Sequence, residues 1–260
     1  MGKRRTSLNV IAGLSLLLAA GCTAKPATHD AASSAGASSS HLARPPAGLS
    51  RVILVGDSVA LGNGLAVGAA LGAAGVEFHS MASDGGGTVV GPPSGQTWAK
   101  LPGRLETAQP STVIYQITSY DWGTEREQKA AYERLLKTVT GVGAKLIVVT
   151  MPPIKPDDFY ADHLDELAHA PTVAREVLAA AGAEGAFLDA GAVWGEKYER
   201  ARNGKVERSS DGVHTCPQGA ARFTAWLLDE LAEVYPGFTA PDAGTWANTG
   251  WAGDDHFVGC

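Results

Sequence analysis

The stretch Arg51-Val52-Ile53-Leu54-Val55-Gly56-Asp57-Ser58 decides how this chain folds. Residues 52–55 are apolar and mostly β-branched, which is typical of a short buried strand. The strand ends at Gly56, and small and apolar residues recur from residue 59 to residue 71, as expected for a helix packed on a sheet. Ser58 therefore falls at a strand-to-helix turn.

The rest of the chain repeats this alternation. Further strands are predicted at residues 76–81, 112–117, 145–150 and 186–189, and helices at 125–139, 164–181 and 217–234. Pro171 predicts a kink or break in the helix at 164–181, whereas Pro217 suits the first turn of the last helix. Alternating strands and helices predict an α/β domain with a parallel sheet and helices on both faces. Its ligand site is expected at the carboxyl ends of the strands.

Ser58 is the first candidate at that edge. A serine at such a turn points its hydroxyl out of the sheet, beside the free amides of a helix N-terminus. This position suits a nucleophile, and the amides suit half of an oxyanion hole. The alternative is that Ser58 only caps the helix, a role that serine favours.

A second candidate motif is Ser209-Ser210-Asp211-Gly212-Val213-His214, just before the last helix. In a segment that is not helical, Asp211 and His214 can meet, so that the carboxylate holds one ring nitrogen. The other nitrogen is then free to take a proton from Ser58.

Val55-Gly56-Asp57-Ser58 and Asp211-Gly212-Val213-His214 together resemble the SGNH (GDSL-type) hydrolase superfamily, over about residues 51–234. The resemblance implies a three-layer α/β/α, flavodoxin-like fold with a five-stranded parallel sheet. It implies ester hydrolysis or, less often, acyl transfer. It also implies that Ser58 is the nucleophile, His214 the base and Asp211 the orienting acid.

Two further positions follow from the resemblance. The glycine that donates an amide to the oxyanion should be Gly85, although Gly86 fits nearly as well. Where the family has Gly-x-Asn-Asp, this chain has Thr118-Ser119-Tyr120-Asp121, so Tyr120 replaces the oxyanion asparagine. Three interpretations stay open: the hole uses the Ser58 and Gly85 amides alone, Tyr120 donates from another angle, or the domain is slow or does not hydrolyse esters.

Loop aromatics could form the floor of a sugar or acyl site. Trp98, Trp122 and Tyr160 are the candidates, and ordinary packing is the alternative. Asp254-Asp255-His256 could suggest a metal ion, but we interpret it as part of a tail that wraps the domain. The sequence predicts no metal site and no cofactor.

The N-terminal segment is predicted to be removed. Residues 1–21 combine Lys3-Arg4-Arg5 with a short apolar run, as secretory signals do. The ending Leu18-Ala19-Ala20-Gly21-Cys22 resembles the lipobox of bacterial lipoproteins, which implies a lipid on Cys22. The alternative is an ordinary signal peptide with an incidental cysteine.

The domain organisation follows. Residues 22–49, rich in Ala, Ser and Pro, predict a flexible stalk; residues 50–235 form the hydrolase domain, and residues 236–260 a C-terminal tail. If Cys22 carries lipid, Cys216 and Cys260 remain, and we predict that they form a disulfide that clamps the tail. Two free thiols are the alternative.

Charge excludes some partners. The chain has 21 basic and 27 acidic residues, a net charge of −6. Removal of residues 1–21, with three bases and no acid, leaves 18 against 27, a net charge of −9. This argues against nucleic-acid binding and against anchoring by a polybasic patch.

The sequence thus predicts a monomeric serine esterase, lipid-anchored to the outer face of the bacterial cell membrane. Its substrates would be O-acyl esters of cell-envelope glycans or small lipidic esters. The alternatives are an O-acyltransferase acting on a glycan and a glycan-binding lipoprotein without catalysis.

Overall fold

A computed structural model describes residues 48–260 except residues 92 and 156. The predicted signal segment, Cys22 and all of the predicted stalk except residues 48 and 49 lie outside the described residues. Among the described helices, none is both long and apolar enough to cross a membrane.

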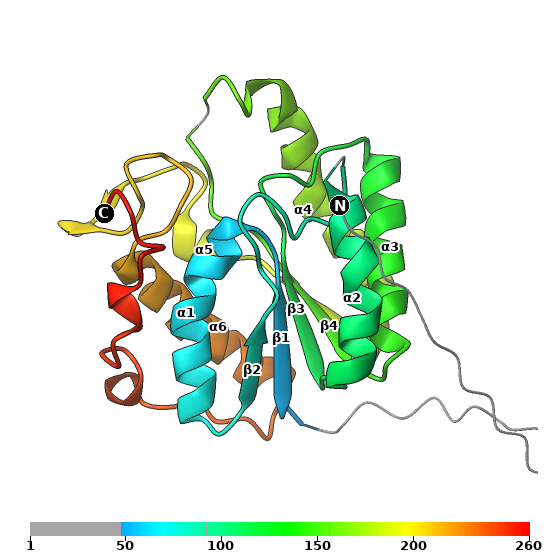
Figure 1. The fold of residues 1–260 in the computed structure, drawn as a ribbon, viewed down its shortest axis with the longest axis horizontal. Coiled ribbons are helices and arrows are strands. Elements are labelled where there is room, and N and C mark those ends of the chain that lie inside the picture. Colours follow the sequence, from blue (N-terminus) through cyan, green and yellow to red (C-terminus); the bar gives the residue numbers. More distant parts are fainter. Residues whose placement is uncertain (1–47, 92, 156) are drawn as a thin grey trace, which may run out of the picture. The chain divides into compact units, whose positions relative to one another are not determined.

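A five-stranded sheet forms the centre of the domain (Figure 1). Its strands are β1 (Arg51–Val55), β2 (Glu77–Ser80), β3 (Thr112–Gln116), β4 (Lys145–Val149) and β5 (Gly185–Leu188). The strand order is β2-β1-β3-β4-β5, and every neighbouring pair is parallel. The predicted α/β fold with a five-stranded parallel sheet is therefore confirmed.

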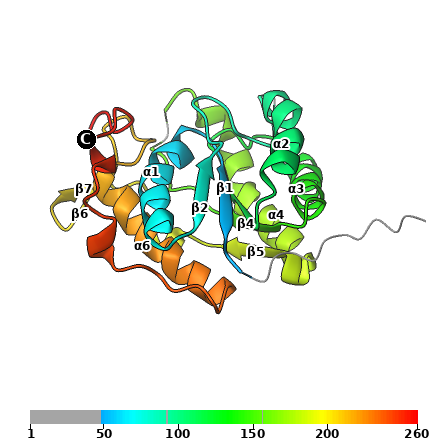
Figure 2. The same cartoon turned by 60° about the horizontal axis from the view of Figure 1, so that its bottom comes forward.

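Helices cover both faces of this sheet (Figure 2). They are α1 (Ser58–Ala73), α2 (Ser94–Ala108), α3 (Glu125–Thr140), α4 (Leu164–Ala180), α5 (Gly191–Trp194) and α6 (Pro217–Val234). Successive strand residues alternate between faces: Val52 and Leu54 pack with α1 and α6, whereas Ile53 and Val55 pack with α2, α3 and α4. Burial on both faces explains why β1, β3 and β4 are mostly apolar, whereas β2, at the edge of the sheet, is mostly exposed and polar.

Two of the longer helices, α4 and α2, differ from the sequence prediction, and the short helix α5 was not predicted. Helix α4 continues through Pro171, so a break there is wrong. The helix buries Ala170, Val173 and Ala174 against the core, and this packing offsets the backbone hydrogen bond that proline cannot donate. Helix α2 was not predicted, because its glycines and Pro102 obscure the spacing of its buried residues, Leu101 and Leu105.

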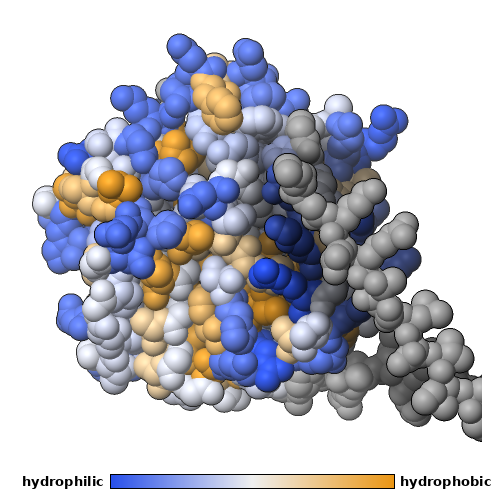
Figure 3. All heavy atoms as spheres, viewed as in Figure 1, coloured by the Kyte–Doolittle hydropathy of each residue, from blue (hydrophilic) through white to orange (hydrophobic). Residues whose placement is uncertain are grey.

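Shorter elements complete the described chain. They are the hairpin of β6 (Ala201–Arg202) and β7 (Lys205–Val206), and 3-10 turns η1 (Ala161–His163), η2 (Gly182–Glu184), η3 (Ala243–Thr245) and η4 (Trp251–Gly253). On the face seen in Figure 3, hydrophobic patches are small and lie among hydrophilic residues.

The C-terminal tail returns to the domain. Trp246 is almost fully buried in the core beside α6, and Phe257 packs near Gly62 of α1. The predicted disulfide is present: Cys216 and Cys260 are bonded, with their Cα atoms 5.6 Å apart. Cys260 is thereby joined to the residue that precedes α6.

Candidate active site

Ser58, His214 and Asp211 meet at the carboxyl end of the sheet. Ser58 is the first residue of α1, and the loop that carries Asp211 and His214 leads into α6, which packs against α1. His214 Nε2 lies 2.7 Å from Ser58 Oγ, and His214 Nδ1 lies 2.8 Å from Asp211 Oδ2. Because a carboxylate can only accept hydrogen bonds, the proton of the ring lies on Nδ1. Nε2 therefore accepts the hydrogen bond that the Ser58 hydroxyl donates.

The Asp211 carboxylate is held in its charged form. Burial tends to raise the pKa of Asp211, but hydrogen bonds from the Val213 and His214 amides and from the His214 ring outweigh it and lower the pKa to about 2. The same amide bonds fold the loop so that the side chains at positions 211 and 214 face each other. The short spacing of the motif thus produces the geometry.

Asp57 supports the turn beneath the nucleophile. Its Oδ1 accepts the amides of Val59 and Ala60, and its Oδ2 accepts both the amide and the hydroxyl of Ser119. Complete burial raises the pKa of Asp57, against the lowering effect of these bonds. Asp57 is therefore the helix cap, and within the described structure the Ser58 amide has no acceptor. That amide is available to an oxyanion.

The loop after β2 distinguishes the two glycine candidates. The Gly86 amide donates to the Ser83 carbonyl, at 3.3 Å. The Gly85 amide has no acceptor among residues 48–91, 93–155 and 157–260. Gly85 also adopts a φ of +60°, with open space where a Cβ would lie. The geometry thus favours Gly85 over Gly86 as the donor that the sequence left open.

Gly87 fixes this loop against the turn after β1. Its φ is +77°, and a Cβ there would lie 1.7 Å from the Gly56 carbonyl oxygen. Only glycine allows the two backbones to approach so closely. This contact holds the Gly85 segment next to the turn that carries Ser58.

Tyr120 lies in an aromatic cluster. Its ring centroid is 5.5 Å from that of Trp122, 6.3 Å from Phe159 and 6.5 Å from Tyr160. Within the described structure it makes no hydrogen bond to Ser58, His214 or Asp211, so its donor role stays a prediction. Tyr160, by contrast, makes a side-chain hydrogen bond: its hydroxyl donates to Ser119 Oγ at 3.4 Å. Burial raises the pKa of Tyr160 to about 12.

Buried Asp121 holds the segment that carries Tyr120. Its carboxylate accepts hydrogen bonds from the hydroxyls of Thr88, Tyr115, Thr118 and Tyr132, at 2.6–2.7 Å. Burial raises the pKa of Asp121, while these hydroxyls lower it. Thr88 follows the glycine loop, so Asp121 links that loop to the segment after β3. No pattern in the sequence predicted this role.

Arg208 is a second residue that the sequence analysis missed. Its buried guanidinium donates to the carbonyls of Pro153 (2.7 Å), Val213 (2.8 Å) and His214 (3.3 Å). Burial lowers the pKa of Arg208 to about 10, and no described carboxylate pairs with it. An arginine before the Asp-x-x-His motif carried no signal in the sequence, because arginine is usually exposed.

Asn63 is the third. This buried α1 residue accepts a hydrogen bond from Thr215 Oγ1, 3.0 Å away, and donates to Gln116 Oε1, 3.1 Å away. It therefore connects the helix of Ser58 with the residue after His214. A lone asparagine between Gly62 and Gly64, on an otherwise apolar helix, was the available signal.

Solved structures share this architecture. No family model matches the sequence, and a search of curated proteins finds no match. An acetylxylan esterase from Geobacillus stearothermophilus, in a catalytic mutant, is 14% identical with a TM-score of 0.53, over 75% of this chain and 97% of that one. A GDSL-like lipase from Bacteroides thetaiotaomicron is 14% identical, with a TM-score of 0.51, over 70% of this chain and 88% of that one. The chain shares its fold with these hydrolases.

A third structure agrees with this assignment. It is an α/β hydrolase from the metagenome of Lake Arreo, 13% identical, with a TM-score of 0.55, over 73% of this chain and 98% of that one. At such identities the likeness establishes the fold alone. The activity has to be argued from the site itself.

The site shows no arrangement for a metal ion. Among the described residues, no group of three or more His, Cys, Asp or Glu side chains could hold one. His256 Nδ1 instead lies 2.8 Å from Asp254 Oδ1, and His256 Nε2 lies 3.8 Å from Oδ2 of Asp84, the residue before the candidate oxyanion glycine. The tail thus reaches the rim of the site.

Proposed function

We propose that the protein is a serine esterase that hydrolyses carboxylic O-acyl esters through an acyl-enzyme. One observation carries this proposal: the uninterrupted hydrogen-bonded chain from Ser58 Oγ through both ring nitrogens of His214 to Asp211. Such a chain is the arrangement that activates a serine hydroxyl.

The reaction follows from the geometry. Ser58 Oγ attacks the ester carbonyl while its proton passes to His214 Nε2, and Asp211 stabilises the imidazolium that forms. The amides of Ser58 and Gly85 donate to the oxyanion. Collapse of the intermediate releases the alcohol, which takes the proton from His214, and leaves an acyl group on Ser58. Water, deprotonated by His214, then releases the acid.

We further propose acylated cell-envelope glycans as substrates, at an extracytoplasmic, lipid-anchored location. The signal-like residues 1–21, the lipobox-like Cys22 and the Cys216–Cys260 disulfide support that location, since disulfides persist in oxidising compartments. A Cys22→Ser variant should then move from the membrane fraction to the soluble fraction.

The direct test is hydrolysis of a short-chain p-nitrophenyl ester by the protein, with Ser58→Ala, His214→Ala and Asp211→Asn as variants. We expect Ser58→Ala to lower kcat by about 10³-fold or more. A fluorophosphonate probe should label the wild-type protein and not Ser58→Ala. Equal rates in wild type and Ser58→Ala would refute hydrolysis at this serine, and absence of labelling would favour a binding protein.

A further inference from the structure

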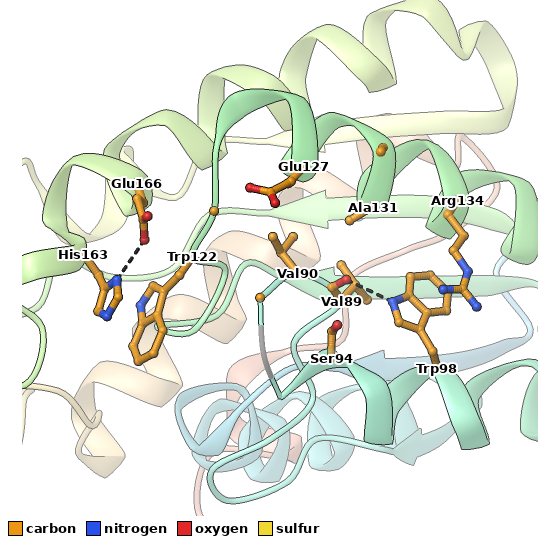
Figure 4. Close-up of a pocket in the computed structure, with 13 residues that line it drawn as sticks. Val89, Val90, Ser94, Trp98, Trp122, Glu127, Ala131, Arg134, His163 and Glu166 are labelled. Carbon is orange, nitrogen blue, oxygen red and sulfur yellow. Dashed lines mark hydrogen bonds and ion pairs between the residues drawn. The ribbon is translucent and has the colours of Figure 1, made fainter.

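A cavity of about 750 Å³ opens between α2 and α3 (Figure 4). Ser58, Asp211 and His214 do not line it. We infer that this cavity binds a segment of a saccharide chain and thereby selects oligomeric or polymeric acylated glycans. The inference rests on the proposed function and names the part of the protein that would recognise the substrate.

One end of the cavity is formed by Trp122. Its ring stacks on His163, with centroids 3.8 Å apart and planes within 6°. His163 is held in turn by Glu166, whose carboxylate lies 2.8 Å from Nδ1. The indole is therefore fixed from one side, and it lines the cavity together with both of these residues.

The other end is formed by Trp98 of α2. Its Nε1 donates to the Val89 carbonyl at 3.0 Å, which fixes the ring, and the Arg134 guanidinium lies 3.9 Å above its centroid. Within the described structure Arg134 pairs with no carboxylate. Its N–H groups are thus available to a bound ligand.

The chemistry of the lining fits a sugar better than other ligands. Val89 and Val90 supply apolar surface between the two indoles, while Glu127, Glu166 and Arg134 supply acceptors and donors. A pyranose ring presents apolar C–H faces and a rim of hydroxyls, which match such a mixture. A lipid chain would require uniformly apolar walls, and a nucleotide phosphate would require several cations.

Aromatic rings connect the cavity with the nucleophile. The ring centroid of Tyr120 lies 5.5 Å from that of Trp122 and 6.5 Å from that of Tyr160. Tyr160 packs in one cluster with Val59 and Val213, the neighbours of Ser58 and His214. A chain held in the cavity can therefore extend over these rings and present an acyl group to Ser58. Tyr120 then acts in substrate contact, a role different from the oxyanion donor that is one of the three interpretations of this position.

The test measures binding without turnover, in the full chain with Ser58→Ala. The probes are partly acetylated xylo-oligosaccharides and O-acetylated peptidoglycan fragments, followed by tryptophan fluorescence and calorimetry. We expect saturable binding of at least one probe, weakened about tenfold by Trp98→Ala, which removes a ring for stacking, and by Arg134→Ala, which removes hydrogen-bond donors. Arg126→Ala, an exposed arginine of the same helix outside the cavity, should leave the affinity unchanged.

The outcomes separate the two proposals. If no glycan binds, or if Arg134→Ala binds as tightly as its Arg126→Ala control, the cavity is not the saccharide site, whatever the rate on p-nitrophenyl esters. If glycan binds through the cavity but wild type hydrolyses no ester, the inference survives and the esterase proposal fails. Arg134 is exposed, so its variant should fold even if Trp98→Ala does not.

Discussion

Replacement of Arg208 by methionine tests whether a buried cation positions the catalytic histidine. The substitution removes the donors to the carbonyls of Pro153, Val213 and His214 and keeps a side chain of similar length. The two shorter bonds, at 2.7 and 2.8 Å, should each contribute about 1.5–3 kcal/mol, since the donor is charged.

An opposing effect reduces the loss. Burial lowers the pKa of Arg208 from 12.5 to about 10. This shift corresponds to a desolvation cost of about 3 kcal/mol, which methionine does not incur. The net decrease in the free energy of unfolding should therefore be small, about 2 kcal/mol.

Catalysis should suffer more than stability. Without the guanidinium, the carbonyls of Val213 and His214 lose their anchor to the loop after β4. A displacement of the His214 ring by about 1 Å would lower kcat by about 10²-fold. The variant should thus stay folded and turn over p-nitrophenyl acetate slowly, with KM changed little.

Arg222→Met is the matched control. Arg222 also lies over the Trp194 ring, at 5.3 Å against 5.6 Å for Arg208, but it pairs with Glu207 and donates to the Val193 carbonyl. Urea unfolding and kcat are measured for both variants at a temperature where both are folded. If kcat falls equally in both, or if Arg208→Met retains wild-type kcat, the positioning role is refuted.

Three further predictions concern stability. For Asp211→Asn, the loss in free energy of unfolding should be constant above about pH 4 and should vanish as pH falls towards 2. The reason is that a carboxyl group whose folded pKa is depressed to about 2 stabilises the fold only while it is ionised. Urea titrations that show a constant loss down to about pH 2 would contradict this. Cys260→Ser should lower the free energy of unfolding by about 4 kcal/mol, given the 44-residue separation of the bonded cysteines. Cys216→Ser should lower it by the same amount in the same urea assay. Gly87→Ala should destabilise by about 3 kcal/mol or more, since its Cβ meets backbone, while Gly85→Ala should cost about 1 kcal/mol of φ strain; equal melting temperatures for the two variants would argue against the close approach.

Local patterns in the sequence were sufficient for the sheet and for the pairing of Asp211 with His214, whereas the link from His214 to Ser58, 156 positions away, was predicted from the resemblance to SGNH hydrolases. The apolar runs of β1, β3 and β4 are buried on both faces, so their composition alone marks them. Asp211 and His214 are three residues apart, and their geometry is closed by hydrogen bonds within that short span. Predictions of this kind need no knowledge of distant contacts.

The supporting residues could not be predicted, because their roles depend on long-range contacts. Arg208 binds the Pro153 carbonyl 55 positions away, and Asn63 meets Thr215 across 152 positions. Helix α2 was missed for a similar reason: Leu101 and Leu105 pack on the sheet despite the helix-breaking Pro102 between them. Tertiary packing overrides weak local propensity at such places.

The bond between Cys216 and Cys260 has a consequence for the order of events during synthesis. Cys216 lies two positions after His214, yet its partner is made 44 residues later. Ser210, next to Asp211, also donates its amide to the Gly259 carbonyl. The loop that carries the base therefore receives its last supports only when residues 259 and 260 have been added and the thiols oxidised. A chain truncated before residue 259, or one whose thiols stay reduced, would hold this loop less firmly, so that full activity would report an oxidising environment.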